Sequence, residues 1–409
     1  NVDPDLLKES LYKLTDLESR FSLNLNVLDE NRTPGVLSLK LLLQEWIKAQ
    51  IDILLRRSRH RLEKIANRLE LLEGYIIAFL NLDRIIEIIR TEDEPKPVMM
   101  AEFLLTDRQA EAGARMQWDT EGRDWPNRCA SRFVDAAGLR WHVQQFGPPP
   151  GEAPVIVLLH GTGSSSHSWR DVAPALARHC RVLVPDLPGH AFTTMPTPSS
   201  EQSLPGMARR VEQLLEALPL RPTVIVGHSA GAAVGARIAL DGRMRPDALV
   251  SLSGAFVGFG GLAGALFSPL AKLLATGTMA ARLFARQAQD EAFVSRLVRG
   301  TGSSLDETGM RLYARLLQCP AHVRAALAMM AHWELGSLGR ELPRLQLPVW
   351  LVGAANDLTV PALQVAQVAA LLPQARQMVW PGLGHLAHEE RPSQCVALLR
   401  QVLGAITHR

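Results

Sequence analysis

The stretch Thr223-Val-Ile-Val-Gly-His-Ser-Ala-Gly-Ala-Ala-Val-Gly235 decides the fold of the larger part of this chain. An apolar β-branched run meets Gly227-His-Ser-Ala-Gly231, and small residues typical of a packed helix follow. This order predicts a strand, a sharp turn and a helix, with Ser229 at the apex of the turn, as in a G-x-S-x-G nucleophile elbow. Glycines are expected beside the serine because Cβ atoms at Gly227 and Gly231 would clash where strand and helix approach. The alternative, a Gly/Ser-rich loop without chemistry, is disfavoured by the flanking strand and helix signals.

Length and composition bound the remaining possibilities. The 409 residues leave room for two or three domains, and 47% apolar with 21% charged residues is typical of a soluble globular protein. A net charge of +3 is too small to imply a nucleic-acid partner, so DNA is not expected to bind. The four cysteines are far apart without metal-ligand spacing, so we expect reduced thiols, no metal and no cofactor. The polar, acidic start and the lack of a long apolar run predict a cytoplasmic protein without a signal peptide or membrane span.

Composition changes sharply near residue 115. Residues 1–115 hold 17 Lys+Arg and 20 Asp+Glu, whereas the remainder holds 27 basic and 21 acidic residues. Six of the seven lysines lie in the first part, and the second part is rich in Ala, Arg, Gly and Pro. Met116 stands at the break. The contrast indicates two parts of different origin, joined by gene fusion, engineering or assembly error.

The first part predicts a long helix. Between Pro34 and Pro95 there is no proline and there are only two glycines. Apolar residues recur there at alternating spacings of three and four, which is a heptad pattern: Leu62, Ile65, Leu69, Leu72, Ile76 and Phe79. We expect a helical hairpin or coiled-coil element. The basic run from Arg56 to Arg61 fits either a solvated helix face or a phosphate-contacting patch.

Residues 59–90 and 103–112 resemble the A subunit of bacterial type II topoisomerases, most closely that of topoisomerase IV. The resemblance implies a truncated, all-α piece of the exit-gate region and its coiled coil, without the family's catalytic tyrosine or winged-helix DNA site. DNA cleavage is therefore not expected. A coiled coil without its surroundings exposes its apolar seam, so self-association through residues 35–91, or poor order, is expected. A DNA-associated oligomerisation module is the alternative.

Residues 116–409 predict an α/β architecture. A hairpin is expected from Arg132 to Phe146, followed by alternating strand and helix signals that indicate a mostly parallel sheet covered on both faces. The expected strands are Val155–Leu159, Arg181–Val184, Val224–Val226, Ala248–Leu252, Val349–Val352 and Gln377–Val379. The expected helices are Trp169–Ala177, Leu204–Leu218, Ala230–Leu240, Leu363–Leu371 and Pro392–Ile406. This order resembles the α/β-hydrolase fold.

That resemblance assigns an oxyanion hole. Leu159-His-Gly-Thr-Gly163 follows a strand at the position where the family's loop supplies one backbone N–H, and the residue after the nucleophile supplies the other. Thr162 and Ala230 are the corresponding donors. A plain glycine-rich turn is the alternative.

Two further residues complete a candidate triad. Asp357 lies just past a late strand, in Gly353-Ala-Ala-Asn-Asp-Leu, where the acid that orients the histidine is expected. His385 lies in Gly382-Leu-Gly-His-Leu, which fits the family's terminal histidine loop, and would act as general base and then acid. The chain order Ser229, Asp357, His385 is the hydrolase order. A turn or cap role is the alternative for Asp357, and His388 is interpreted as a helix-start or packing histidine.

An apolar, helix-rich insertion from Gly254 to about Arg340 predicts a lid. Its uncharged, glycine-studded start indicates a large apolar substrate or a peripheral membrane contact, or else residues that pack the lid's own core. Histidines near the mouth are interpreted as loop-shaping or pocket-wall residues. The residues predicted to contact substrate are His160, Gly161, His228 and Phe256.

Several segments of residues 116–409 resemble the magnesium-chelatase accessory proteins of bacteriochlorophyll synthesis, which are α/β-hydrolase homologues. The segments are Asp124–Arg128, His160–Trp169, Gly227–Ala233, Leu266–Ala271 and Gly382–Glu390. One departure is Ala191, where the family usually has glycine. The resemblance implies porphyrin metabolism, with a small apolar or porphyrin-type substrate and magnesium-chelatase subunits as partners.

Two functions follow from these observations: a serine-dependent acyl or ester hydrolase, or a non-catalytic accessory protein that binds porphyrin or docks on the chelatase. The expected domain boundaries are a helical fragment at 1–112, a junction at 113–128, a hydrolase core at 129–254 and 341–409, and a lid at 255–340.

Overall fold

The chain divides into two compact units in the computed structural model. A helical unit comprises residues 1–87 and 99–110, and a sheet unit comprises residues 88–98 and 111–409. The structure describes residues 3–17, 26–28, 34–36, 38–81, 84, 88, 95–105, 115–149, 151–257 and 278–407.

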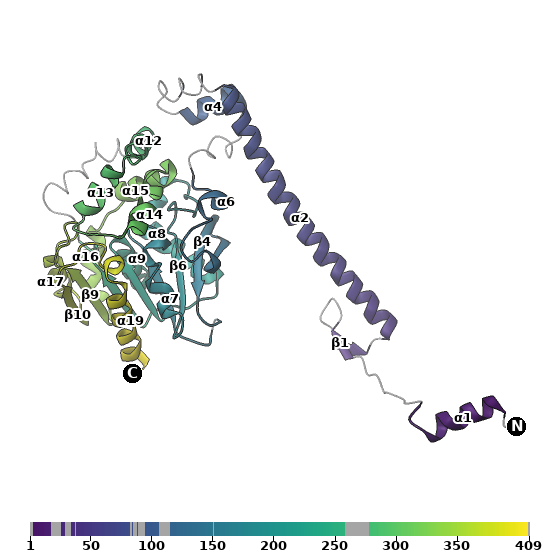
Figure 1. Ribbon diagram of the computed structural model, residues 1–409. Helices are drawn as coiled ribbons and strands as arrows, with labels where there is room; N and C mark the ends of the chain where they lie inside the picture. Colours follow the sequence, from purple (N-terminus) through teal and green to yellow (C-terminus); the bar gives the residue numbers. More distant parts are fainter. Residues whose placement is uncertain are drawn as a thin grey trace. The chain divides into compact units, whose positions relative to one another are not determined.

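One long helix dominates the helical unit (Figure 1). Helix α2 runs for 42 residues, Leu39–Leu80, which confirms the predicted long helix. It begins where Ser38 caps it, the Ser38 hydroxyl accepting a hydrogen bond from the Leu41 N–H at 3.4 Å. The other elements in this region are α1 (Pro4–Leu14), the antiparallel pair β1 (Asn26–Leu28) and β2 (Pro34–Val36), and α4 (Pro95–Phe103). The β1–β2 pair was not anticipated from the sequence.

Many apolar side chains of α2 are exposed. The large apolar residues of α2 that are at least 39% exposed are Leu39, Leu41, Leu43, Trp46, Ile47, Ile51, Ile53, Leu54, Leu55, Leu62, Ile65 and Leu69. They include the first three positions of the predicted heptad seam. The side chains of Leu72, Ile76 and Phe79, which complete that seam, lie outside the described part of the structure.

The sheet unit is built on an eight-stranded sheet with the order β10-β9-β8-β7-β5-β6-β4-β3. Strand β4 pairs antiparallel with β3 and with β6, and the other neighbours pair parallel. The strands are β3 (Ser131–Ala136), β4 (Leu139–Phe146), β5 (Val155–Leu159), β6 (Arg181–Pro185), β7 (Val224–His228), β8 (Ala248–Leu252), β9 (Val349–Ala354) and β10 (Ala375–Trp380). The expected mostly parallel sheet is confirmed, and the predicted hairpin forms its antiparallel pair β3–β4.

Helices cover both faces of this sheet (Figure 1). The strands divide their side chains between two hydrophobic clusters, so that Val157 of β5 joins one cluster and Ile156 the other. Helices α8 (Leu204–Ala217) and α9 (Ala230–Asp241) pack in the first cluster, and α7 (Val172–Leu176) and α19 (Pro392–Thr407) pack in the second. The shorter surrounding elements are α6 (Trp118–Glu121), η1 (Arg128–Ala130), η2 (Ser166–Trp169), η3 (Ser199–Gln202), α17 (Leu363–Ala369) and α18 (Ala387–Glu390).

A helical insertion separates β8 from β9. We call its described helices the inserted helices: α12 (Thr278–Gln287), α13 (Glu291–Gly300), α14 (Glu307–Leu317), α15 (Pro320–Ala331) and α16 (Gly336–Glu341). The short turn η4 (Leu342–Arg344) then leads into β9. Most of the apolar run on which the predicted membrane contact depends, residues 258–277, lies outside the described residues.

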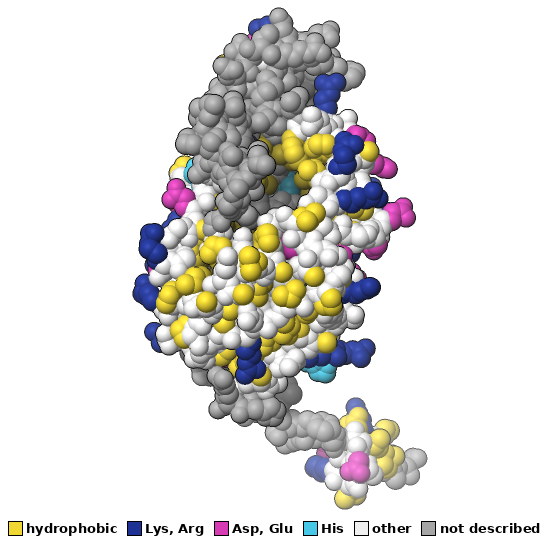
Figure 2. Space-filling model, turned by 90° about the vertical axis from the view of Figure 1, so that its left-hand side faces the viewer, with side chains coloured by type: hydrophobic (Ala, Val, Ile, Leu, Met, Phe, Trp, Pro, Cys, Tyr) yellow, Lys and Arg dark blue, Asp and Glu magenta, His cyan; other side chains and the backbone are white. Residues whose placement is uncertain are grey.

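The surface over α17 and β10 carries scattered apolar side chains, seen in Figure 2. The exposed large apolar residues at this edge of the sheet are Leu358, Leu363, Leu371 and Val379. Among the helices that the structure describes, none combines the length and apolar character that crossing a bilayer requires.

Backbone contact at two glycines joins β5, β7 and α9. A Cβ atom on Gly227 would lie 2.3 Å from the Ala232 nitrogen, and one on Gly231 would lie 2.4 Å from the Leu159 carbonyl oxygen. Both obstacles are backbone atoms, so a side chain could be accommodated only by moving a strand or the helix. The clash expected from the sequence is therefore present.

We predict that Gly227→Ala lowers the free energy of unfolding by about 3 kcal/mol or more, because the added methyl group overlaps backbone. Gly300→Ala is the matched control, since a Cβ on that exposed helical residue meets nothing within 4 Å. It should stabilise by about 0.5–1 kcal/mol. Urea unfolding of both variants tests this, and equal stabilities would contradict it.

Candidate active site

Ser229 occupies a strained turn at the carboxyl end of β7. Its φ of 52° and ψ of −118° lie outside the regions that non-glycine residues favour. Three backbone hydrogen bonds hold it there. Its N–H donates to the Leu252 carbonyl at 3.0 Å, and its own carbonyl accepts from the N–H groups of Ala232 and Ala255, both at 3.1 Å. The residue is half-buried, so its side chain stays within reach of a ligand.

The Gly161–Ser164 loop, which follows β5, lies directly beside this turn. A Cβ on Gly161 would be 3.1 Å from the Ser229 Cβ and 2.9 Å from the His228 Nδ1, so only glycine leaves room. The Gly161 carbonyl accepts two hydrogen bonds, from the His160 Nδ1–H at 2.8 Å and from the Ser164 N–H at 3.2 Å. Because C=O and N–H point in opposite directions across a trans peptide, this anchoring turns the Thr162 N–H away from His160.

Ala230 is the first residue of α9. Its N–H therefore belongs to the first turn of the helix, where N–H groups have no intrahelical acceptor and the helix dipole favours negative charge. The two predicted oxyanion donors thus lie on the two segments, loop and helix start, that flank Ser229.

Asp357 and His385 form a close pair. The His385 Nδ1–H donates to Asp357 Oδ2 at 2.8 Å, while Asp357 Oδ1 accepts from the N–H groups of Thr359 and Val360, each at 2.8 Å. Burial alone would raise the pKa of Asp357, but these hydrogen bonds and the nearby imidazole hold its pKa below the usual value. The carboxylate therefore stays ionised and orients the ring so that Nε2 is free for chemistry.

The loop that carries His385 is held on several sides. Its carbonyl accepts from the His228 Nε2–H at 2.9 Å, and the preceding Gly384 N–H donates to Glu390 Oε1 at 2.9 Å. The segment after α13 also contacts the His385 loop, because the Leu386 N–H donates to Ser303 Oγ at 2.8 Å. No local sequence signal indicates this contact, which joins residues 83 positions apart.

The four residues predicted to contact substrate have different environments. Gly161 adjoins Ser229, as described above. His160 is fully buried, and its Nε2 accepts from the Leu187 N–H at 2.8 Å. His228 is 3% exposed behind the His385 loop, and Phe256 is 2% exposed in the same hydrophobic cluster as Met329. Both histidines thus have the geometry of loop-shaping residues.

Buried neutral histidines surround the site. Among the described residues, burial lowers the pKa of His160, His167, His190, His228, His322 and His388. Burial, reinforced by the neighbouring His385, brings the pKa of His228 to about 3. His388 is 1% exposed, and its ring centroid lies 4.5 Å from those of both Trp169 and His228.

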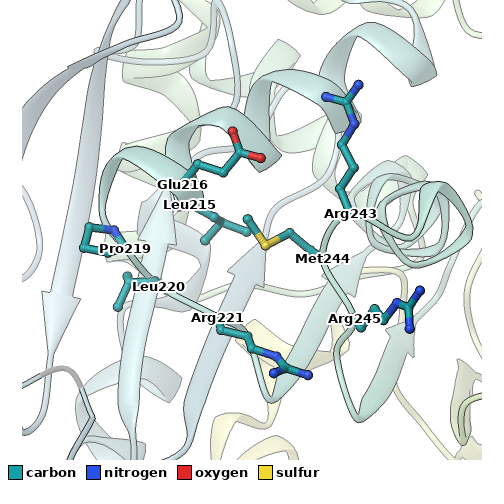
Figure 3. Close-up of a pocket in the computed structure, with 8 residues that line it drawn as sticks. All are labelled: Leu215, Glu216, Pro219, Leu220, Arg221, Arg243, Met244 and Arg245. Atoms are coloured by element: carbon teal, nitrogen blue, oxygen red, sulfur yellow. The ribbon is translucent and has the colours of Figure 1, made fainter.

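A separate cavity of about 430 Å³ lies at the amino ends of β7 and β8. Figure 3 shows its lining from the end of α8 and the loops before β7 and β8: Leu215, Glu216, Pro219, Leu220, Arg221, Arg243, Met244 and Arg245. Ser229 instead follows the carboxyl end of β7, so this cavity is not the candidate active site. In the described part of the chain, no group of three or more His, Cys, Asp or Glu side chains could hold a metal ion.

Comparison with known proteins divides the chain in the same two parts. The α/β hydrolase fold family matches residues 154–392, and the family of the DNA gyrase/topoisomerase IV A subunits matches residues 1–120. The magnesium-chelatase 30 kDa subunit of Rhodobacter capsulatus is 38% identical over 266 residues, which cover 65% of this chain and 92% of that protein. The solved structure of an α/β hydrolase fold protein from Burkholderia ambifaria is similar, with a TM-score of 0.55 and 25% sequence identity. The match covers 66% of this chain and 98% of the Burkholderia chain.

The helical unit has its own relatives. The A subunit of DNA topoisomerase 4 from Caulobacter vibrioides is 52% identical over 112 residues, or 27% of this chain. That match spans only 15% of the topoisomerase protein. The expected resemblances to both protein classes are confirmed.

The buried histidines predict a steep acid sensitivity. Their folded pKa values lie below the unfolded value of about 6.5, so between these values the unfolded chain binds more protons and stability falls as pH falls. We predict that His388→Leu makes the fall in unfolding free energy between pH 5.5 and 4.5 shallower, by at most about 1.4 kcal/mol per pH unit, because up to one proton fewer is taken up on unfolding.

Urea unfolding at a series of pH values measures this slope. His179→Leu, at an exposed position, is the matched control and should leave it unchanged. Identical slopes for His388→Leu and the unsubstituted chain would contradict the assignment of His388 as a buried neutral histidine.

Proposed function

The chain belongs to the α/β-hydrolase fold family, and on that premise we propose that it is a serine hydrolase whose nucleophile is Ser229. The observation that carries the proposal is the Asp357–His385 pair, held at 2.8 Å on a loop whose His385 carbonyl accepts from His228, the residue that precedes the strained Ser229. A strained turn, an ionised carboxylate and an oriented imidazole are what activation of a serine hydroxyl requires.

The proposed reaction is hydrolysis of an ester or similar acyl compound. Ser229 Oγ attacks the acyl carbon while His385 Nε2 accepts the hydroxyl proton, and Asp357 stabilises the imidazolium that forms. His385 then protonates the departing alcohol, which leaves an acyl-enzyme. Water, deprotonated by His385, attacks this ester, and the acid and free serine are released.

The Thr162 and Ala230 N–H groups are the proposed oxyanion donors. Two fixed donors matter because negative charge develops on the carbonyl oxygen, and losing one donor in such a hole costs roughly 10²–10³-fold in rate. The anchored Gly161 carbonyl supports this role for Thr162, since the peptide cannot rotate without breaking both of its hydrogen bonds.

We also propose that the protein acts beside magnesium chelatase in bacteriochlorophyll or porphyrin metabolism, on a small apolar or porphyrin-type acyl substrate. The relative named as a magnesium-chelatase 30 kDa subunit supports this context, and chelatase subunits are the proposed partners. The expected lid, residues 255–340, contains α12 to α15 and most of α16 of the inserted helices. The rival function, porphyrin binding or chelatase docking without catalysis, is a distinct outcome of the test below.

The helical unit is proposed to self-associate through residues 35–91 rather than to act on DNA. The exposed apolar side chains of α2 support this, because such a surface is normally covered by a partner. The chain contains only a small part of the topoisomerase protein, so we do not propose the activity of the whole topoisomerase for this chain.

We predict that a fluorophosphonate probe labels the chain at Ser229 and that Ser229→Ala abolishes labelling. The variant should also lose at least about 10³-fold in hydrolysis of p-nitrophenyl esters, because no other group forms the acyl-enzyme. Gel fluorescence and peptide mass spectrometry give the labelled position.

The same preparation distinguishes the rival function. Folded protein that is neither labelled nor active on a panel of esters, yet binds porphyrin equally before and after Ser229→Ala, would refute hydrolysis and support the accessory role.

We further predict that the full 44.9 kDa chain forms oligomers and that Leu62→Glu combined with Ile65→Glu makes it monomeric. Two carboxylates on exposed apolar positions would have to be desolvated in any helix-to-helix contact. Light scattering after size exclusion measures the mass. Arg61→Gln, at a residue that is likewise exposed, is the control and should leave the mass unchanged. A monomeric unsubstituted chain would refute the proposal.

A further inference from the structure

Three consecutive residues of the Gly161–Ser164 loop contact side chains of the inserted helices. The Thr162 hydroxyl donates to Met329 Sδ at 3.4 Å, a contact that ties the loop to α15. The next carbonyl, that of Gly163, accepts from the His322 Nε2–H of α15 at 3.0 Å. The Ser164 hydroxyl then lies 3.1 Å from the Tyr313 hydroxyl of α14.

From these contacts we infer that α14 and α15 hold the Gly161–Ser164 loop, called the oxyanion loop below because it carries the proposed Thr162 donor, in its working conformation. Hydrolysis would then require these helices to stay docked on the loop. His322 is the central positioning residue, and Tyr313 the second. The inference rests on the proposed function for its catalytic consequence, but the docking itself is a property of the loop and can be measured without turnover.

His322 is fixed by both ring nitrogens. Its Nδ1 accepts from the Ala191 N–H at 3.0 Å, so the ring proton must be on Nε2, where it is donated to Gly163. The residue is 1% exposed, and burial lowers its pKa to about 4. The neutral, singly protonated ring that this geometry needs is therefore the form present near neutral pH.

Tyr313 extends the same support to the histidine loop. Its hydroxyl donates to Glu389 Oε1 at 2.8 Å and is therefore left to accept from Ser164. Glu389 is buried and also accepts from Arg170 Nη1 at 2.6 Å. Arg170 in turn reaches Asp306, the residue that caps α14, at 3.0 Å. Helix α14 is thus bonded to the oxyanion loop, and through Glu389 to the residues that follow His385.

These contacts act on the peptides that flank the oxyanion donor. The Gly161 carbonyl is held from inside the sheet unit by His160, and the Gly163 carbonyl is held by His322. The Thr162 N–H lies between these two fixed carbonyls. The Gly163 carbonyl shares a peptide with the Ser164 N–H, which donates to the Gly161 carbonyl, so loss of the His322 anchor would free one of the two bonds that hold the Gly161–Thr162 peptide. The Thr162 N–H would then be less firmly oriented, which weakens a bond made most strongly in the transition state and so lowers kcat more than it changes KM.

Two substitutions of His322 separate the two ring nitrogens. The side-chain amide of Gln reaches the Nε2 position and keeps a donor for Gly163, whereas that of Asn reaches only the Nδ1 position and keeps an acceptor for Ala191. Each variant loses one of the two hydrogen bonds of His322, so general destabilisation should be similar in both. Only His322→Asn releases the oxyanion loop.

The test compares His322→Asn and His322→Gln in the full chain by two measurements. Hydrogen–deuterium exchange of peptides covering residues 160–166 should accelerate at least about 10-fold in His322→Asn and stay near the unsubstituted rate in His322→Gln. With p-nitrophenyl acetate, kcat should fall about 10-fold in His322→Asn, with KM nearly unchanged. This loss is smaller than the roughly 10²–10³-fold loss of rate that removal of a whole oxyanion donor causes. In His322→Gln, kcat should be largely retained.

The possible outcomes are distinguishable. Equal exchange in the two variants overturns the inference whatever the activity, because the loop would then not depend on the Gly163 contact. Faster exchange in His322→Asn with unchanged kcat overturns the catalytic consequence. An unsubstituted chain that is neither labelled by fluorophosphonate nor active overturns the proposed function instead, and the exchange comparison still decides whether the helices hold the loop.

Discussion

The close backbone approach at Gly227 and Gly231 is the constraint on which the site depends. It forces β7 to pass into α9 through a single strained residue, so Ser229 projects from the turn instead of packing in it. The same approach brings the end of β5 against the start of α9, and with it the loop that begins at Gly161. One steric condition therefore positions the proposed nucleophile, a helix N-terminus and a loop amide together, because all three follow from the geometry of two adjacent parallel strands.

A layer of neutral histidines supports this geometry from behind. His160, His228 and His322 each use a ring N–H to hold a backbone carbonyl of a loop in the site. Imidazole suits this task because one ring can donate and accept at the same time without carrying charge, provided that burial keeps it deprotonated. The site would therefore be assembled only where these rings stay neutral, and its integrity and the acid stability of the sheet unit have a common physical origin.

The parts of this structure that sequence could predict are those encoded by local patterns. The β-branched run before Gly227 and the glycines around Ser229 specify strand, turn and helix within a dozen residues, and the absence of Pro between residues 34 and 95 specifies a long helix in the same way. Asp357 and His385 could be nominated because each follows a strand of the expected order. The partners of the loops could not: Ser303, Tyr313 and His322 reach the site across more than 80 residues, and no local sequence pattern marks these contacts. Nor could pattern alone show that the rings of His160 and His228 are turned inward onto backbone carbonyls.

The central claim, that Ser229 forms an acyl-enzyme, is tested most directly by trapping that species. The full chain is mixed with p-nitrophenyl acetate, quenched in acid within the first turnover and examined by intact-protein and peptide mass spectrometry. We expect one added acetyl group, located on Ser229, which disappears as deacylation proceeds. No acetylation of Ser229 in folded protein, or acetylation confined to surface amines, would contradict the claim.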